Sequence, residues 1–148
     1  MAMISEGRLN DNVAVAGVIQ AAAITAGATG VLTAAIDMSK FGQLEAVILS
    51  GTLGSSGTLD AKFVESDASG GTYTAISGRA ITQLVKATDD NKVVVLKLNA
   101  SDLGSGKRYV KLNLVAGTAN ATSSAVVLGT PKGEYDATDV NVTIAESK

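Results

Sequence analysis

Apolar and polar residues alternate in several short stretches of the chain. In residues 58–65, Leu59, Ala61 and Phe63 alternate with residues that are mostly polar. Residues 108–115 repeat this pattern, with apolar side chains at every second position. Because successive side chains of a β-strand point to opposite faces, a period of two predicts strands with one buried face and one solvated face.

Turn-forming residues separate these stretches at regular intervals. Gly and Ser are concentrated in residues 51–57, and a second polar turn runs from Asp67 to Gly71. The second turn predicts a hairpin that joins the strand 58–65 to a strand over residues 72–76. Many short strands separated by turns are typical of a sandwich or a barrel. We therefore predict an all-β, single-domain antiparallel β-sandwich of jelly-roll type with extended N- and C-terminal arms.

The other elements are less regular in pattern. Further strands are expected over residues 13–24, 31–38, 44–49, 93–99 and 125–128. Residues 79–86 fit either a strand or a helix, whereas residues 117–124 are polar enough to form a long loop or a hairpin end. A turn is expected over residues 88–92, and a single helical turn over residues 101–104, with Ser101 as a candidate N-cap.

Composition divides the chain into a core and two arms. No charged residue occurs in residues 13–36, and the C-terminal residues carry an excess of acidic side chains. We predict an N-terminal arm with the first strand over residues 1–30, a sandwich core over residues 31–130 and a C-terminal arm over residues 131–148.

The uncharged N-terminal segment is long enough to cross a membrane, but its composition argues against this reading. Its apolar residues are mainly Ala and Gly, Gln and Thr are interspersed, and no basic cluster flanks it. Two strands joined by a Gly-containing turn explain the segment better. We therefore expect no membrane partner.

Composition also limits the chemistry that is available. The chain has 148 residues and contains no His, Cys or Trp. These side chains supply many of the proton shuttles, soft metal ligands and thiolate nucleophiles of proteins, so we expect no enzyme and no cofactor. The net charge of -2 gives no electrostatic basis for nucleic-acid binding. The nearest basic cluster, Lys107, Arg108 and Lys111, would be divided between the two faces of a strand.

Two local motifs have the residue types of a ligand site without its spacing. Asp89 and Asp90 offer adjacent carboxylates but lack the spaced oxygen ligands of a calcium loop, so a structural turn is the favoured interpretation. Residues 51–57 are as rich in Gly and Ser as a phosphate-binding loop, but they lack the Lys-Ser or Lys-Thr ending and the GxGxxG spacing. Neither motif predicts a catalytic or metal site.

Three motifs mark the block from residue 36 to residue 128. They are Asp-Met-Ser-Lys-Phe at 37–41, Ala-Lys-Phe-Val-Glu-Ser-Asp at 61–67 with its hairpin into Thr72-Tyr73, and Ser-Asp-Leu at 101–103 followed by Arg-Tyr-Val-Lys-Leu at 108–112. In this order the motifs resemble the small jelly-roll or sandwich proteins with which tailed bacteriophages cement or decorate their heads. The motifs build the sandwich, so the resemblance assigns no functional residue.

The resemblance implies a structural virion protein that binds the outside of the phage head and stabilises contacts between major capsid subunits. Such a protein is made in the host bacterial cytoplasm and ends up on the capsid surface. The partners implied are the major capsid protein and further copies of the chain itself, as a dimer or trimer.

The two arms supply the candidate partner contacts, because one is uncharged and the other alternates apolar with polar residues. The candidate residues are Val13, Val15, Val18, Ile19, Val140, Val142 and Ile144. A phage tail or neck protein and a carbohydrate-binding or receptor-binding module are the alternative functions. With no Trp and only Tyr73, Tyr109 and Tyr135 as tyrosines, the chain has few aromatic platforms for stacking on sugars.

Overall fold

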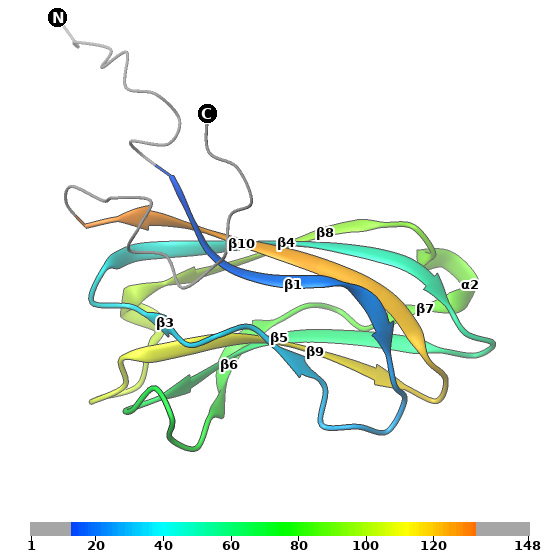
Figure 1. The fold of residues 1–148 in the computed structure, drawn as a ribbon, viewed down its shortest axis with the longest axis horizontal. Helices are drawn as coiled ribbons and strands as arrows, with labels where there is room; N and C mark the ends of the chain where they lie inside the picture. The colour runs from blue at the N-terminus through cyan, green and yellow to red at the C-terminus, as the bar shows by residue number, and fades with distance from the viewer. Residues whose placement is uncertain (1–12, 133–148) are drawn as a thin grey trace, which may run out of the picture.

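Two antiparallel β-sheets face each other in residues 13–132, the part of the chain that the computed structural model describes (Figure 1). The first sheet has the strand order β1-β10-β4-β8. Its strands are β1 (Ala14–Ile24), β10 (Ala121–Pro131), β4 (Phe41–Leu53) and β8 (Val93–Asn99). All three pairs of neighbouring strands in this sheet are antiparallel.

The second sheet has the order β2-β9-β5-β6, with two short strands added to it. Its strands are β2 (Val31–Leu32), β9 (Tyr109–Gly117), β5 (Thr58–Ser66) and β6 (Thr74–Ala80), with β3 (Ile36–Asp37) paired to β9 and β7 (Leu84–Val85) paired to β5. Helical structure in the described residues is limited to α2 (Lys86–Asp89) and the 3-10 turn η1 (Ala100–Asp102). The predicted all-β antiparallel sandwich is confirmed.

The core lies between the sheets and consists almost entirely of aliphatic side chains from both. Fully buried members include Ile24, Leu44, Ile48, Leu53, Leu98 and Val127 from the first sheet, and Leu59, Phe63, Val110, Leu112 and Leu114 from the second. The alternation that marks strands 58–65 and 108–115 in the sequence places the side chains of the second sheet on its inner face. Burying a side chain of this size contributes roughly 1.5–3 kcal/mol, so the packed layer is the main source of stability.

Two strands are longer than the sequence predicts. β4 continues to Leu53 through a segment expected to be a loop, and β10 begins at Ala121, within the predicted loop 117–124. Leu53 and Ala121 are paired across these two strands. The Ser123 hydroxyl donates a hydrogen bond to the Leu49 carbonyl oxygen at 2.9 Å. Pairing between distant segments therefore overrides the turn propensity of Gly, Ser and Thr in both places.

Residues 79–86 are neither one helix nor one strand. β6 ends at Ala80, and β7 and α2 follow after a short irregular segment. The turn predicted over residues 88–92 is partly helical, because α2 extends to Asp89. The hairpin predicted across Asp67 to Gly71 is confirmed, since β5 and β6 pair antiparallel on either side of it.

The helical turn after β8 is present, but its cap differs from the prediction. Asn99, rather than Ser101, precedes η1. The Asn99 N–H donates to the Asp102 carboxylate at 2.7 Å, which closes the turn at its start. Asp102, at the third position of the turn, thus makes the capping-box contact to the backbone of the residue that precedes the turn.

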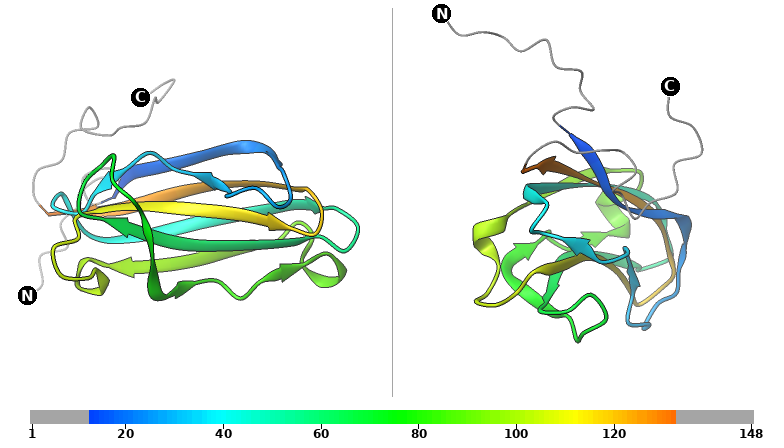
Figure 2. Two further views of the ribbon diagram at one scale, coloured as in Figure 1. Left: turned by 90° about the horizontal axis from the view of Figure 1, so that it is seen from below. Right: turned by 60° about the vertical axis from the view of Figure 1, so that its left-hand side comes forward.

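The N-terminal stretch 13–24 forms an edge strand of the first sheet. β1 pairs with β10 along its length, with two register shifts that allow it to curve over the sandwich. The two views of Figure 2 show β1 lying against β10 in the same layer. None of the helices in residues 13–132 is long and apolar enough to cross a membrane.

Candidate functional site

The two sheets differ in the chemistry of their outer faces. On the first sheet, most outward-facing positions of the central region carry aliphatic side chains. We call this surface the aliphatic face; its residues are Val15, Val18, Val47, Leu49, Val93, Val95, Val126 and Leu128. On the outer face of the second sheet, the central strands mix polar residues, which include Asp60, Lys62 and Lys111, with Val64 and Val115. The exposed apolar residues of this sheet, Val31, Leu32 and Val85, lie in the short strands β2 and β7. A continuous aliphatic surface across the central strands is therefore a property of the first sheet.

The strand registers align the valines of the aliphatic face in a row. Val18 lies opposite Val126, Val126 opposite Val47, and Val47 opposite Val95, so the row crosses all four strands. Directly opposite side chains in adjacent strands lie close enough to pack against each other. The row therefore forms one continuous surface instead of four separate apolar spots.

The side of this surface near β8 is the most exposed. Leu49 and Val93 are opposite each other and are 44% and 63% exposed, and Val95 is 47% exposed. An antiparallel sheet with a solvated outer face normally carries polar residues at such positions. Aliphatic residues here form an exposed apolar patch, which makes this surface the candidate contact site.

Polar groups border the aliphatic face at one end. Lys97 and Glu45 are opposite each other on β8 and β4 and form an exposed ion pair with an N–O distance of 3.6 Å. One step further along, the Gln43 side chain donates to the Thr130 hydroxyl at 3.4 Å. An exposed ion pair of this kind contributes little to stability, so its main effect is to limit where an apolar partner surface can lie.

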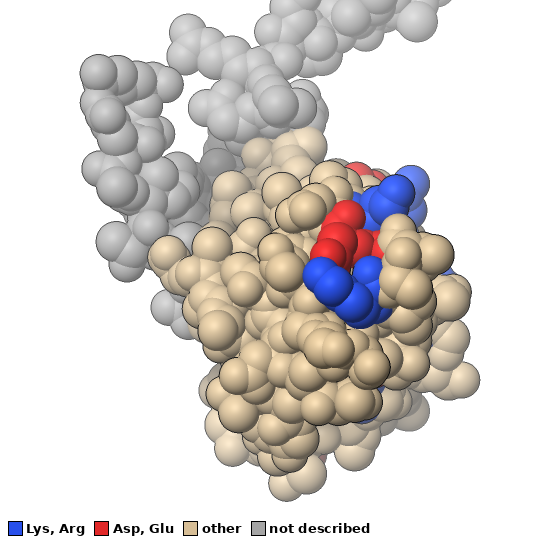
Figure 3. Space-filling view, turned by 90° about the vertical axis from the view of Figure 1, so that its right-hand side faces the viewer, with Lys and Arg blue, Asp and Glu red and all other residues tan. Residues whose placement is uncertain are grey.

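The opposite end of the sandwich carries α2. Figure 3 looks onto this end and shows the charged side chains gathered in one small cluster on a largely uncharged surface. Lys86 and Asp90 form an ion pair here, and the hydrogen bond from Lys86 lowers the pKa of the Asp90 carboxyl. The other carboxylate oxygen of Asp90 accepts a hydrogen bond from the Leu53 N–H at 2.9 Å.

Asp89 and Asp90 therefore have structural roles, as the sequence favoured. Asp89 accepts a hydrogen bond from the Val85 N–H at 2.9 Å, and its own carbonyl oxygen accepts one from the Ser50 hydroxyl at 2.8 Å. Within residues 13–132, no group of three or more Asp or Glu side chains is arranged to hold a metal ion. The Asp90 carboxylate and the Asp89 carbonyl oxygen fasten the β7–α2 segment to β4, and the Asp89 carboxylate closes the start of α2.

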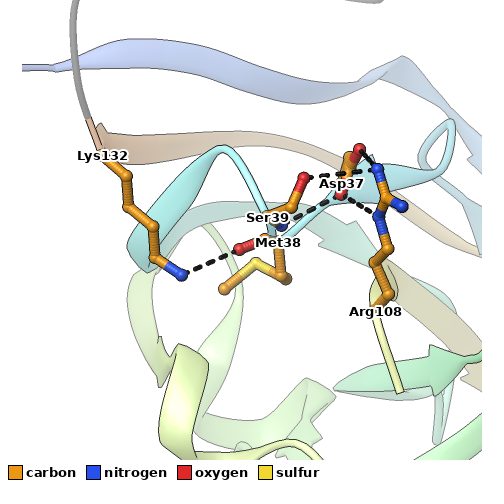
Figure 4. A network of polar contacts seen from close by, with 5 residues as sticks. All are labelled: Asp37, Met38, Ser39, Arg108 and Lys132. Atoms are coloured by element: carbon orange, nitrogen blue, oxygen red, sulfur yellow. Dashed lines mark hydrogen bonds and ion pairs between the residues drawn. The ribbon is translucent and has the colours of Figure 1, made fainter. Parts of the chain in front are cut away.

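Two of the resemblance motifs meet in a polar network at the end of the sandwich opposite α2 (Figure 4). The Arg108 guanidinium donates to both carboxylate oxygens of Asp37, at 2.9 and 2.7 Å. This contact holds the pKa of Asp37 well below its usual value. Ser39 N–H donates to Asp37 at 3.0 Å, and Lys132 Nζ donates to the Met38 carbonyl oxygen at 3.3 Å. The network connects β3, β9 and the end of β10, so it stabilises the fold.

Two tyrosines lie near the outer face of the second sheet. Lys111 Nζ lies 4.4 Å from the centre of the Tyr73 ring, and the guanidinium carbon of Arg108 lies 5.3 Å from the centre of the Tyr109 ring. The Tyr73 hydroxyl donates to the Ser69 carbonyl oxygen at 2.9 Å. Burial, and then the neighbouring Tyr109, raise the pKa of the Tyr73 hydroxyl. Each ring has one face engaged by a cation, which reduces the area available for stacking on a sugar.

The candidate contact residues fall into three groups. Val13, Val15 and Val18 are half-buried, and two of them belong to the aliphatic face. Ile19 is 4% exposed and packs in the core between the sheets. The others, Val140, Val142 and Ile144, lie outside the described residues.

Sequence reasoning did not identify the most exposed part of the aliphatic face, which is formed by Leu49, Val93 and Val95. A signal was present. In residues 93–96 the run Val-Val-Val-Leu interrupts the alternation, and residues 46–49 form a second unbroken apolar run. Where both faces of a strand are apolar, both are expected to be covered.

No protein-family model matches the chain, and no curated protein matches it significantly in sequence. Solved structures resemble it at low identity. They include the SPBc2 prophage-derived protein YomS, with 18% identity, a TM-score of 0.37 and coverage of 74% of this chain and 94% of that chain.

Two further likenesses cover only part of much longer chains. One is to the CBM22-1-GH10 modules of Clostridium thermocellum xylanase 10B, with 10% identity, a TM-score of 0.41 and coverage of 93% of this chain and 28% of that chain. The other is to a structure of infectious bursal disease virus Gx strain, with 16% identity, a TM-score of 0.40 and coverage of 84% and 32%. At these TM-scores the likenesses assign neither a family nor a function to the chain.

Proposed function

We propose that this protein is a structural protein of the virion, and that it binds the outside of a tailed-phage head as a cement or decoration protein. The observation that carries the proposal is the aliphatic face. Its valine row crosses all four strands of the first sheet, whereas the central strands of the second sheet carry charged residues on their outer face. A sandwich with this difference between its sheets is suited to lie flat on another protein through its first sheet.

The chemistry of the aliphatic face favours a protein partner. It presents branched aliphatic side chains and one bordering ion pair between Glu45 and Lys97. It presents no cluster of Lys and Arg of the kind that binds phosphate groups. The partner that we propose is the outer surface of the major capsid protein.

The resemblance of the sequence to head cement proteins supports this choice of partner. Two of the motifs that carry the resemblance, at residues 37–41 and 108–112, contact each other through the Asp37–Arg108 ion pair. They build one end of the sandwich and leave the aliphatic face free. The fold and the proposed contact surface are therefore encoded by different residues.

The proposed mechanism is mechanical. Each copy would cover a junction between capsid subunits and bury apolar area that must be exposed again before the subunits can separate. Stable protein interfaces bury on the order of 1,600 Å² in total. Because a closed shell repeats the contact at every equivalent position, many modest contacts together would resist the internal pressure of the packaged DNA.

A lysine placed on the aliphatic face is expected to weaken head binding without unfolding the protein. In L49K the new charge must be desolvated when an apolar partner surface covers it, so we expect at least about a tenfold loss of affinity. The measurement is co-sedimentation of the variant with purified phage heads that lack the protein. The matched control is T74K, which adds the same charge at an exposed position of β6 on the second sheet.

Both variants change exposed side chains, so their unfolding free energies are expected to stay within about 0.5 kcal/mol of wild type. Equal binding of L49K and wild type would mean that the aliphatic face does not contact the head. Loss of binding in T74K alone would mean that the second sheet contacts the head.

A further inference from the structure

The edge strand β8 leaves one side of its backbone unpaired within the described part of the chain. It ends the first sheet and pairs only with β4, and it runs along the rim of the molecule in Figure 2. Just before β8, Ser50 N–H donates to the Lys92 carbonyl oxygen at 2.8 Å. Bonded residues alternate along an antiparallel pair, so the even-numbered residues of β8 bond to β4.

The odd-numbered residues of β8 therefore direct their N–H and C=O groups to the open edge. Asn99 supports this assignment, because its N–H is bound from outside the sheet by the Asp102 carboxylate at 2.7 Å. Val93, Val95 and Lys97 have no such bond to any other residue in 13–132. Three consecutive outward-directed donor and acceptor pairs are available for another strand.

The side chains of β8 do little to prevent such pairing. Natural proteins protect open edges with Pro, bulges or repeated charges. β8 contains no Pro or Gly, and its register with β4 has no bulge. Val93 and Val95 are among the most exposed large apolar residues of the described chain. Lys97 is the only charged residue of the strand.

We propose that β8 pairs antiparallel with β8 of a second copy, around a twofold axis at Val95, so that the two first sheets become one continuous sheet. In this register Val95 lies opposite Val95 of the partner subunit, and Val93 lies opposite Lys97 of the partner subunit. The three outward-directed residues of each copy pair with one another and form about six hydrogen bonds. This inference does not depend on the proposed function.

A second copy fits this edge because the edge is complementary to itself. The axis at Val95 keeps the two Lys97 ammonium groups away from each other, whereas an axis at Lys97 would place like charges directly opposite. An axis at Leu96 would place Val93 opposite Asn99 of the partner subunit, whose N–H is already occupied. The axis at Val95 alone uses every open residue.

The pairing also extends the aliphatic face. A twofold axis perpendicular to the sheet places the outer faces of both first sheets on the same side. The valine row that ends at Val95 in one copy then continues into the row of the other. Dimerisation covers the open edge and doubles the width of the apolar surface.

The first test is the mass of the full-length protein in solution, measured by sedimentation equilibrium across a range of concentrations. Wild type is expected to have twice the monomer mass. V95K places two like charges opposite each other at the axis, so its dimer dissociation constant is expected to rise by at least about tenfold. V95P removes an outward N–H and no bond to β4, and Pro is tolerated in edge strands at such positions.

Circular dichroism and thermal unfolding establish that both Val95 variants remain folded. A wild-type protein that is monomeric at every concentration would overturn the proposal. A dimer whose mass is unchanged in both V95K and V95P would also overturn it, because the contact would then lie on another surface.

The second test reports the register. V93E places a carboxylate opposite Lys97 of the partner subunit and is expected to tighten the dimer, whereas V93K places a like charge there and is expected to weaken it. The difference between V93E and V93K should shrink as salt is added. Equal effects of the two variants would refute the axis at Val95.

The third test is a cross-link. The chain has no Cys, so V95C supplies the only thiol. Under mild oxidation V95C is expected to give a covalent dimer, and Q20C, at an exposed position of the edge strand β1, is expected to remain monomeric. Cross-linking of Q20C without cross-linking of V95C would assign the contact to β1 and contradict the proposal.

Discussion

Replacement of Phe63 by Ala is expected to destabilise the protein by about 3–5 kcal/mol. Phe63 is fully buried and is the largest of the fully buried side chains. Its neighbours in the core are mainly aliphatic, and the chain contains only two Phe. The substitution leaves a cavity between the two sheets. Strand pairing holds the sheets in place, so they can collapse around this cavity only in part. Since domains are typically stable by about 5–15 kcal/mol, this loss is a large fraction of the total.

The loss is measured from the urea midpoint and slope of F63A beside wild type. The matched control is F63L, which keeps most of the apolar volume and is expected to lose about 1 kcal/mol. A change below about 1 kcal/mol in F63A would mean that the two sheets do not close over Phe63 in solution.

Replacement of Gly30 by Ala is expected to have the next largest effect. Gly30 ends the turn that takes the chain from β1 in the first sheet to β2 in the second, and its φ of +99° disfavours any L side chain. A Cβ at this position would lie 2.5 Å from the Leu114 carbonyl oxygen and would overlap the Asn113 side chain. Backbone on β9 cannot move away without disturbing its pairing with β5.

The same turn supplies the control for this prediction. Gly27 also has a positive φ, of +73°, but a Cβ there meets no atom within 4 Å. G27A therefore reports the backbone strain alone, about 1–2 kcal/mol. We expect G30A to unfold with a free energy at least about 2 kcal/mol lower than that of G27A, because overpacking adds to the strain. Equal losses in chemical denaturation would mean that the turn does not approach β9 as closely as the structure has it.

The architecture could be predicted from the sequence where the alternation is clear. β5 and β9 were located by a period of two, and the turn between Asp67 and Gly71 identified the β5–β6 hairpin, because these signals depend only on neighbouring residues. The full lengths of β4 and β10 could not be predicted. Their ends are held by pairing between Leu53 and Ala121, which are far apart in the chain.

The candidate site could be predicted only in part for a similar reason. Alternation shows which residues share a face, but the strand order that brings Val18, Val126 and Val47 into one row is set by the tertiary fold. Val18 was identified from the uncharged N-terminal stretch. The sequence predicts Val93 and Val95 as part of a strand, but their exposure depends on the position of β8 at a sheet edge.

The measurement that tests the proposed function most directly is the number of copies of this protein in purified phage particles, relative to the major capsid protein, by quantitative mass spectrometry. A cement or decoration protein is predicted to approach the abundance of the major capsid protein, because it occupies equivalent sites across the whole shell. A few copies per particle would place the protein in the tail or neck, and its absence from particles would contradict a virion role.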